Sequence, residues 1–373
     1  MDGGGLMRAI LSLSGGMDST SLLINLLSNG YEVSCISFDY GQKHKLELIK
    51  AKNNIMFLRE NGHKIDHKII DLTSAMNLLS SALTDPKINI PEGHYEEDQM
   101  KLTVVPNRNA IFSSILYGYA ISLSNLHNTD VQIALGVHSG DHTIYPDCRP
   151  EFYESINNSF SLGNWDSEKV SFYLPFIEGN KKYILEDALK SCQILGISFD
   201  TIFANTITSY NPDSKGRSSG KSGSDVERIL AFHSIGRIDP IEYVKPWEEI
   251  LKNALEIELR HHVTRNNGTE RGFTGKYDDH FDEGEYRCYN CNILLFTSDM
   301  KYNSNCGWPA FHSEHSDAKI KKVIDTSHGM KRVEVRCSQC DSHLGHIFDD
   351  GPNEYGNNRY CINSISLDFK ENK

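Results

Sequence analysis

The sequence has no long hydrophobic run. Although 39% of its 373 residues are hydrophobic, no stretch reaches the roughly 18 apolar residues that a membrane-spanning helix needs. The N-terminal segment has too short an apolar part, and no cleavage signature, for a secretory signal. We therefore expect a cytoplasmic globular protein without a membrane partner, and the length favours two or three domains.

Positive charge is also scarce. The chain has 38 lysine and arginine residues against 50 aspartate and glutamate residues, so its net charge is −12. A protein that binds nucleic acid usually carries a basic face that neutralises phosphates. The charge balance therefore disfavours direct nucleic-acid binding and favours small molecules or other proteins as partners.

Cysteine is nearly absent from the first 287 residues, which contain only Cys35, Cys148 and Cys192. The other six of the nine cysteines lie between residues 288 and 361. In a reducing compartment, such clustering indicates metal binding or thiol chemistry rather than a disulfide framework.

Short apolar runs alternate with helical patterns in the first part of the chain. The runs expected as strands are 8–13, 32–38, 68–72 and 131–137, and the stretches expected as helices are 18–27 and 44–61. This alternation is typical of an open α/β fold with a parallel sheet, whose ligands bind at the carboxyl ends of the strands. The glycine-bearing turns at 14–16 and 39–41 both fall at such ends.

The pattern changes near residue 244. A helix is expected at 246–262, followed by a stretch rich in Gly, Asn and Thr and by strand-like runs at 332–336 and 360–369. These features predict a small mainly-β domain with a helical lead-in. The expected domains are therefore 7–243 and 246–370.

Two CxxC pairs occur in this second domain. They are Cys288 with Cys291, and Cys337 with Cys340. Two intervening residues let both thiolates of a pair reach one ion, and two pairs complete a closed tetrahedral Zn²⁺ site. Such a site is structural, because no ligand position remains for a substrate. A zinc-binding interaction module without redox chemistry is the alternative for this region.

Several segments around the two remaining cysteines resemble the B-type methionine sulfoxide reductases, or peptide-methionine (R)-S-oxide reductases. They are Thr269-Glu-Arg-Gly-Phe273, Cys306-Gly-Trp-Pro-Ala-Phe311, Thr326-Ser-His-Gly-Met330, Glu334-Val-Arg-Cys-Ser-Gln-Cys-Asp-Ser-His-Leu-Gly-His346 and Arg359-Tyr-Cys-Ile-Asn-Ser364. The resemblance covers about 246–370 and implies a mainly-β zinc-containing fold. It also implies reduction of oxidised methionine in proteins or peptides.

The resemblance implies that Cys361 attacks the sulfoxide sulfur as a thiolate and that Cys306 resolves the resulting sulfenic acid into a disulfide. A thioredoxin-type reductant then restores the two thiols. The other residues expected at this site are Arg359, favouring the thiolate, His343 and His346, holding or protonating the sulfoxide oxygen, Trp308, packing on the substrate methyl, and Asn363. For Asn363, a structural role and a contact with the substrate backbone both stay open.

The first glycine turn, Ser14-Gly-Gly-Met-Asp-Ser19, follows an expected strand and opens an expected helix. Glycines let the backbone approach phosphate, and N–H groups at a helix N-terminus point at it. The turn lacks the Gly-Lys-Ser/Thr end of a Walker motif and resembles the PP-loop of ATP pyrophosphatases. It predicts binding of ATP with Mg²⁺ through Ser14, Gly15, Gly16, Asp18 and Ser19.

Further segments resemble the 7-cyano-7-deazaguanine synthases of queuosine biosynthesis, over about 7–243. They are Ser37-Phe-Asp-Tyr-Gly-Gln-Lys-His44, Val105-Pro-Asn-Arg-Asn109, Gly136-Val-His138 and Tyr145-Pro-Asp-Cys-Arg-Pro-Glu-Phe152. The resemblance implies a Rossmann-like PP-loop fold that converts 7-carboxy-7-deazaguanine and ammonia to the nitrile with ATP. It implies substrate contacts for Asp39, Gln42, Lys43, Arg108, Asn109, Asp147, Arg149 and Glu151, and a phosphate contact for Lys181.

The match departs from the family where four zinc-binding cysteines are expected. The corresponding positions hold Ser209, Ser219, Ser222 and Asp225. Hydroxyl groups are poor zinc ligands, so we expect no zinc in the first domain. The whole chain is then interpreted as a bifunctional fusion of synthase and reductase. The alternative is a first domain that is degenerate, or has a changed substrate, beside an active reductase.

Overall fold

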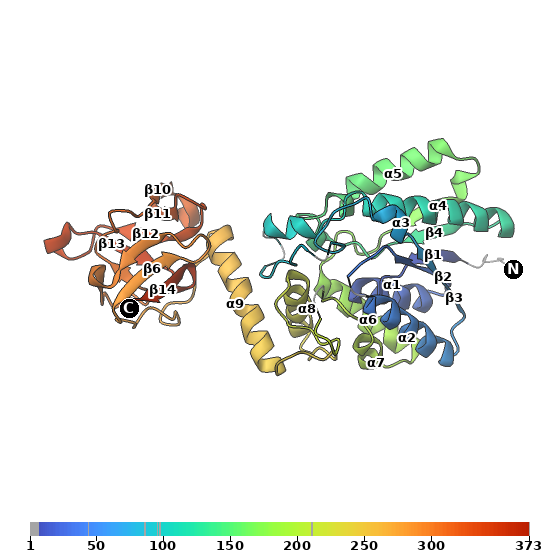
Figure 1. The fold of residues 1–373 in the computed structure, drawn as a ribbon, viewed down its shortest axis with the longest axis horizontal. Coiled ribbons are helices and arrows are strands. Elements are labelled where there is room, and N and C mark those ends of the chain that lie inside the picture. The colour runs from blue at the N-terminus through green and yellow to red at the C-terminus, as the bar shows by residue number, and fades with distance from the viewer. Residues whose placement is uncertain are drawn as a thin grey trace. The chain divides into compact units, whose positions relative to one another are not determined.

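The structure is a computed structural model that describes residues 7–372 except 44, 86, 95, 97, 210 and 211. The chain divides into two compact units, Met1–Ala254 and Leu255–Lys373, here called the N-terminal and C-terminal units (Figure 1). The division lies within helix α9 (Trp247–Asn266), the helix expected at 246–262. Within the described residues, no helix is both long enough and apolar enough to cross a membrane.

A five-stranded sheet forms the centre of the N-terminal unit. Its strands are β1 (Arg8–Ser12), β2 (Glu32–Asp39), β3 (Ile65–Asp71), β4 (Val131–Ala134) and β5 (Val170–Tyr173). They run parallel in the order β3-β2-β1-β4-β5, which confirms the predicted α/β fold. The strand order reverses between β1 and β4, and ligands of such sheets bind at this switch point.

Helices cover both faces of this sheet (Figure 1). They are α1 (Met17–Ser28), α2 (Leu46–Glu60), α3 (Thr73–Met76), α4 (Arg108–His127), α5 (Pro150–Gly163), α6 (Lys181–Leu195), α7 (Phe199–Ala204) and α8 (Gly223–Ser234). Successive strand residues point to opposite faces, so β1 sends Leu11 into the core beneath α1 and α6 and sends Ile10 into the core beneath α4. The sheet is therefore buried on both faces.

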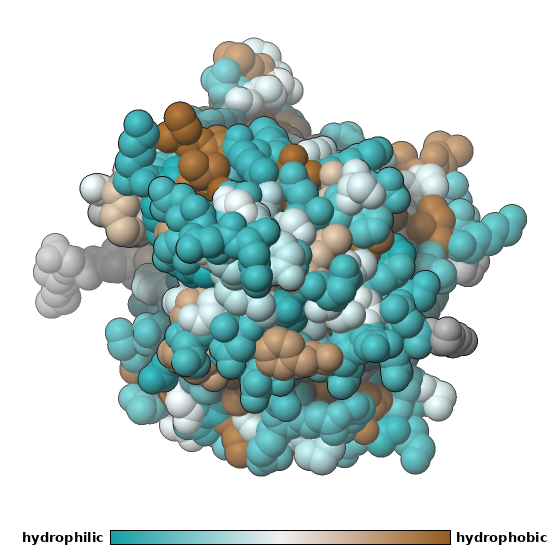
Figure 2. All heavy atoms as spheres, turned by 90° about the vertical axis from the view of Figure 1, so that its left-hand side faces the viewer, coloured by the Kyte–Doolittle hydropathy of each residue, from teal (hydrophilic) through white to brown (hydrophobic). Residues whose placement is uncertain are grey.

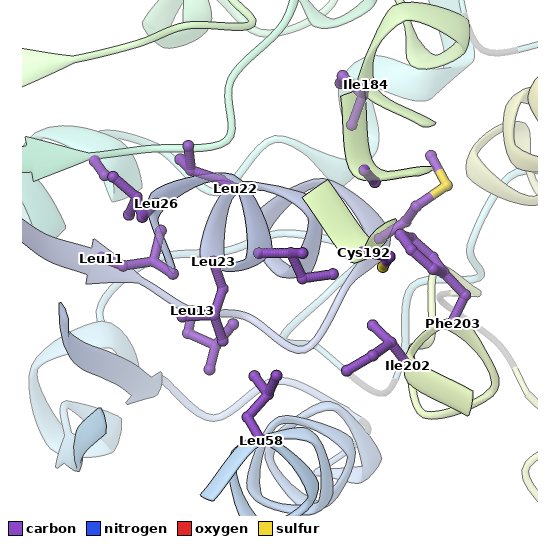
Figure 3. Packing of buried hydrophobic residues seen from close by; sticks show 14 of the residues in the cluster. Leu11, Leu13, Leu22, Leu23, Leu26, Leu58, Ile184, Cys192, Ile202 and Phe203 are labelled. Atoms are coloured by element: carbon purple, nitrogen blue, oxygen red, sulfur yellow. The ribbon is translucent and has the colours of Figure 1, made fainter. Parts of the chain in front are cut away.

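The core on the α1 side is apolar and fully buried (Figure 3). Leu22, Leu23 and Leu26 of α1 pack there between the strand residue Leu11 and Ile184 of α6. This packing fixes the start of α1 against the end of β1. Removing one such leucine side chain typically costs about 2–5 kcal/mol of stability.

The C-terminal unit is mainly β, as predicted. Its strands are β6 (Gly284–Cys288), β7 (Leu294–Thr297), β8 (Lys301–Tyr302), β9 (Ala310–Phe311), β10 (Ile320–Asp325), β11 (Arg332–Cys337), β12 (His343–Phe348), β13 (Arg359–Ile362) and β14 (Leu367–Glu371). One sheet has the order β10-β11-β12-β13-β9-β8, and the other has the order β14-β6-β7. All the pairings are antiparallel.

The run expected as a single strand at 360–369 is in fact two strands. A 3₁₀ turn at Ser364–Ser366 separates β13 from β14 and carries the chain from the larger sheet to the smaller one. Buried aromatic side chains, among them Phe296 stacked on Phe311, fill the space inside the unit. On the face drawn in Figure 2, hydrophilic residues predominate and hydrophobic residues form small separate groups.

Candidate active sites and metal centre

The PP-loop turn of the N-terminal unit connects β1 to α1. Gly15 has a φ of +90°, and a Cβ there would lie 2.2 Å from the backbone oxygen of Glu47, so only glycine fits. The N-cap of α1 is Gly16, which has no side chain that could accept from the helix. The first N–H groups of α1 are therefore available to an anion. The hydroxyls of Ser14 and Ser19 lie 2.9 Å apart across the turn.

This turn opens into a cavity of about 230 Å³ at the switch point. The predicted site residues that line it are Ser14, Gly16, Asp18, Ser19, Arg108, Asn109 and Lys181. They come from the turn after β1 and the starts of α1, α4 and α6. Parts of the chain that are far apart in sequence therefore converge on one cavity.

Lys181 is the buried cation of the cavity. Its Nζ lies 2.9 Å from Asp18 Oδ2, 3.4 Å from Glu227 Oε2 and 3.1 Å from His138 Nε2. Burial opposes the charge of the lysine, but Asp18 and Glu227 outweigh burial and raise its pKa. Burial would raise the pKa of Asp18, but Lys181 and His138 lower it overall. Lys181 is thus held as a cation beside the α1 N-terminus.

Six of the expected substrate residues lie outside the residues that line the cavity. They are Asp39, Gln42, Lys43, Asp147, Arg149 and Glu151. Gln42 and Lys43 bind backbone oxygens of Phe38 and Ile88, and Arg149 donates to the His142 oxygen. Each of these three side chains donates to a backbone oxygen, so its observed contact stabilises the local backbone.

Of the other three expected residues, only Asp147 makes a side-chain hydrogen bond to a described residue that lines the cavity. Asp39 pairs with Lys45 at 2.7 Å. Asp147 Oδ2 accepts from the backbone N–H of Asn109 at 3.3 Å and so helps to position the cavity residue Asn109. Glu151 is exposed in the first turn of α5.

Sequence reasoning missed several residues that line the cavity. Glu47 of α2 is one of them, and Phe38, Tyr40 and Phe112 form an aromatic wall in which the Phe38 and Phe112 rings stack at 4.1 Å. Burial raises the pKa of the Glu47 carboxyl to about 7, and Arg108 limits the rise. Because Glu47 reaches the cavity only through the packing of α2 against Gly15, no local motif could have revealed it.

The residues at the expected zinc positions of the N-terminal unit do not fit zinc. Ser209 donates to Asp225 Oδ2 at 3.2 Å, and Ser222 accepts from the Asp225 N–H at 3.3 Å. Burial raises the pKa of Asp225, and the hydroxyls of Ser218, Ser222 and Ser209 oppose the rise. Three hydroxyls and one carboxylate are a poor donor set for zinc.

Ser219, which stands at the fourth of these positions, has a different partner. Ser219 instead accepts from the N–H of Lys221, and the buried Ser218 takes its place beside Asp225. We call Ser209, Ser218, Ser222 and Asp225 the serine–aspartate cluster. Its members hydrogen-bond one another in the region where the resemblance implies a metal.

A buried ion pair braces the same region. Arg228 of α8 donates to both oxygens of Asp239, at 2.6 and 2.8 Å, and both side chains are completely buried. Arg228 also donates to the hydroxyls of Thr206 and Thr208. The segment on both sides of α8 is therefore tied together by charge-assisted hydrogen bonds.

In the C-terminal unit the four CxxC cysteines form one cluster, as predicted. Their sulfur atoms all lie within 4.8 Å of one another, with Cys288–Cys340 at 3.6 Å and Cys291–Cys337 at 3.5 Å. Tetrahedral zinc with Zn–S bonds of about 2.3 Å places sulfurs about 3.8 Å apart, so the donor set fits zinc.

The two CxxC turns have the same backbone geometry. Each is followed by a left-handed residue, Asn292 or Asp341, whose N–H donates to the oxygen of Cys288 or Cys337, at 2.8 and 2.9 Å. Matching turns present matching pairs of sulfurs. A zinc ion held by these four ligands would have no open position, which is typical of a structural site.

Cys306 and Cys361, here called the thiol pair, lie together with their sulfurs 3.7 Å apart. Cys361 is on β13 opposite His346 of β12 and Ala310 of β9. The hydrogen bond from Cys361, together with the Ser304 hydroxyl, lowers the pKa of Cys306 to about 5, against the effect of burial. Its hydrogen bond to Cys306 and its burial raise the pKa of Cys361.

The thiol pair thus shares one proton and carries one negative charge at neutral pH. The lowered pKa of Cys306 places the charge on Cys306 and the proton on Cys361. Either sulfur can donate in this hydrogen bond, so transfer of the proton to Cys306 produces the Cys361 thiolate. A shared proton provides a thiolate nucleophile next to a second thiol.

Carboxylates that the sequence analysis did not single out hold the two expected histidines. His343 Nδ1 lies 2.6 Å from Glu334, and His346 Nε2 lies 2.8 Å from Asp325. A bulge at Leu344 shifts the register of β12, so both rings reach one side with centroids 5.4 Å apart. Burial lowers the pKa of His343, and its buried Nε2 has no hydrogen-bond partner among the described residues.

The remaining expected residues of this site have structural partners. Arg359, two residues from Cys361 on the same strand, is bound by both oxygens of Asp350 at 2.8 and 2.9 Å. Trp308 donates to the backbone oxygen of Glu270 at 3.0 Å. Asn363 is buried, accepts from the Glu270 N–H and donates to the Leu344 oxygen. The structure therefore favours the structural alternative for Asn363.

Comparison with known proteins matches a family model to each unit. Residues 8–236 match the model described as Queuosine biosynthesis protein QueC, which spans more than half of the chain. The chain therefore belongs to the QueC family. Residues 257–371 match the SelR domain model. Both resemblances that the sequence analysis stated are confirmed.

Several relatives of similar sequence align with the N-terminal unit. A 7-cyano-7-deazaguanine synthase of Methanoregula boonei is 42% identical over 237 residues, covering 64% of this chain and 99% of the relative. Synthases of Marinomonas sp. and Caldicellulosiruptor saccharolyticus are 41% and 43% identical, covering 63% and 64% of this chain and 98% and 96% of those relatives. The chain thus contains almost the full length of these enzymes.

Proposed function

We propose that this chain is a bifunctional enzyme. The N-terminal unit converts 7-carboxy-7-deazaguanine and ammonia to 7-cyano-7-deazaguanine with ATP and Mg²⁺. The C-terminal unit reduces methionine-R-sulfoxide. The observation that carries the synthase is the convergence of the PP-loop and Lys181 on one cavity at the switch point. The observation that carries the reductase is the thiol pair, at 3.7 Å.

The synthase reaction needs two activations of one carbon. The substrate carboxylate attacks the α-phosphorus of ATP, pyrophosphate leaves, and the N–H groups of α1 with Lys181 stabilise its charge. Ammonia then displaces AMP to give the amide. The amide oxygen is adenylated in turn, and loss of AMP with the remaining N–H protons forms the nitrile. Asp18 holds Lys181 in place for both rounds.

The reductase reaction is a two-electron exchange at sulfur. The Cys361 thiolate attacks the sulfoxide sulfur while His343 or His346 supplies protons to the oxygen. Methionine leaves, and Cys361 retains the oxygen as a sulfenic acid. Cys306 then attacks Cys361, water leaves, and a disulfide forms. A thioredoxin-type dithiol supplies the two electrons that restore the pair.

The closing of this disulfide needs little motion. The two sulfurs are 3.7 Å apart, and a disulfide bond is about 2.05 Å long. A shift of under 2 Å, shared by two side chains, therefore completes the step. Zinc bound by the four CxxC cysteines would hold the ends of β6 and β11 and would take no part in this exchange.

Separate assays of the intact chain test the two halves. Pyrophosphate exchange into ATP that depends on 7-carboxy-7-deazaguanine, followed by nitrile formation, tests the synthase. Absence of exchange would leave the degenerate alternative. For the reductase, Cys361→Ser should abolish sulfoxide reduction, whereas Cys306→Ser should release about one methionine per chain and then stop with thioredoxin as reductant. Unchanged reduction by the Cys361→Ser chain would eliminate the mechanism.

A further inference from the structure

The cavity of the N-terminal unit has a carboxylate that the steps above do not use. Glu47 lies in the first turn of α2 and lines the cavity with its partly buried side chain. Within the part of the chain that the structure describes, no group hydrogen-bonds its carboxylate. An acceptor that is kept free of protein donors in a ligand cavity remains available to the ligand.

The place of Glu47 is fixed by the PP-loop itself. The backbone oxygen of Glu47 lies so close to Gly15 that a Cβ there would approach within 2.2 Å. Glu47 therefore moves with the loop that is expected to hold pyrophosphate. Glu47 lines the same cavity as Asp18 and Lys181 but belongs to a different helix from both.

The groups that face Glu47 favour exchange of a proton. They are Arg108 of α4 and Tyr40, which follows β2. Burial outweighs the guanidinium charge and brings the pKa of Glu47 close to neutral, about 7. The pKa of Tyr40 is raised to about 12 by burial, so this phenol keeps its proton. Asp18 and Lys181 pair with each other and lie at the PP-loop, where pyrophosphate is expected to bind.

We propose that the Glu47 carboxylate is the proton acceptor for the ammonia nitrogen in the synthase reaction. The nitrogen lone pair forms the C–N bond, the C–O bond to AMP breaks with its electron pair, and the proton of the ammonium-like nitrogen passes to Glu47. In the second round the two protons left on nitrogen pass to Glu47 one after the other, the first as the amide oxygen is adenylated and the second as the C–O bond to AMP breaks with its electron pair. This inference rests on the proposed synthase function.

The chemistry requires such an acceptor and the cavity offers few. Three nitrogen-bound protons must leave in sequence, one in the first round and two in the second, so the acceptor must take up a proton and release it to solvent before it can take up the next. A carboxylate that titrates near neutral pH does both, and a positioned base contributes typically about 10²–10⁴-fold to such a step. The other carboxylates that line the cavity already have charged or ring-nitrogen partners. Asp18 and Glu227 pair with Lys181, and Asp141 lies 3.5 Å from His138 Nε2.

The test compares Glu47→Gln with Glu60→Gln, an exposed glutamate at the end of the same helix. Substrate-dependent pyrophosphate exchange reports adenylation and folding of the site. Nitrile formation as a function of pH reports proton transfer. Glu47→Gln should keep exchange within about threefold, lose nitrile formation by about 100-fold, and lose the rise in rate through about pH 7. Glu60→Gln should match the unaltered chain.

Three other outcomes would contradict the proposal or the function on which it rests. Unchanged nitrile formation with an unchanged pH profile would overturn the role of Glu47 and leave the synthase function intact. Loss of exchange together with nitrile formation, in both Glu47→Gln and Glu47→Asp, would make Glu47 part of adenylation and overturn the proposal. No exchange in the unaltered chain would instead refute the synthase function itself.

Discussion

The buried Arg228–Asp239 pair makes a strong prediction about what replaces zinc in the N-terminal unit. Asp239→Asn preserves shape but leaves the Arg228 guanidinium, completely buried, without a countercharge. Breaking a buried pair in this way costs about 3–5 kcal/mol. For a domain of roughly 150–250 residues, each kcal/mol lowers the melting temperature by about 2–4 °C. The expected loss is therefore about 6–20 °C.

Calorimetry of the intact chain measures this effect. A chelator should lower the transition of the C-terminal unit, which we expect to contain zinc, and leave that of the N-terminal unit unchanged, which assigns the two. The control is Asp200→Asn, which breaks a pair with Arg237 in which both side chains are exposed. Surface pairs contribute about 1 kcal/mol or less. If the two variants melted alike, the buried pair would not brace this region.

Three further predictions follow from single contacts. Cys337→Ser should reduce bound zinc from about one atom per chain to none by elemental analysis, and retained zinc would refute the four-cysteine site. The alkylation rate of the thiol pair should be constant above about pH 6 and fall below about pH 5, following the lowered pKa of Cys306. Cys361→Ala removes the hydrogen bond to Cys306 and should therefore move this fall to higher pH. An unchanged pH profile in that variant would contradict the role of the hydrogen bond. Gly15→Ala should abolish pyrophosphate exchange, because the new Cβ would lie 2.2 Å from a backbone oxygen. Gly30→Ala, also at positive φ but with open space around it, should retain exchange. Equal losses of exchange in the two variants would show that backbone strain, and not the contact at Gly15, causes the loss.

Local sequence predicts those features that depend on a few consecutive residues. The strand–glycine–helix order around Ser14 and the two CxxC turns each contain their own geometry, so their roles could be proposed before the fold was known. The family resemblance added Lys181, which reaches the PP-loop only because α6 packs beside α1. Neither source predicts side chains that meet through tertiary packing alone.

The missed residues share that dependence on packing. Glu334 reaches His343 because β11 and β12 pair with a bulge in their register, and one residue less would turn the ring to the other face. Ser218 rather than Ser219 faces Asp225 for a similar reason, because a turn decides which of two neighbouring hydroxyls points inward. The break at Ser364–Ser366 is hidden by an apolar pattern that runs through two strands of different sheets.

The distribution of sulfur gives the two units opposite chemistry. The N-terminal unit contains Cys35, Cys148 and Cys192, all buried, and burial raises the pKa of each thiol. A protonated, buried thiol reacts slowly with oxidants, because the thiolate is the nucleophile. Its serine–aspartate cluster offers oxidants no sulfur where the resemblance implies four zinc thiolates. Reactive thiolate is therefore concentrated in the C-terminal unit, at the one site where its oxidation is a step of the proposed reaction.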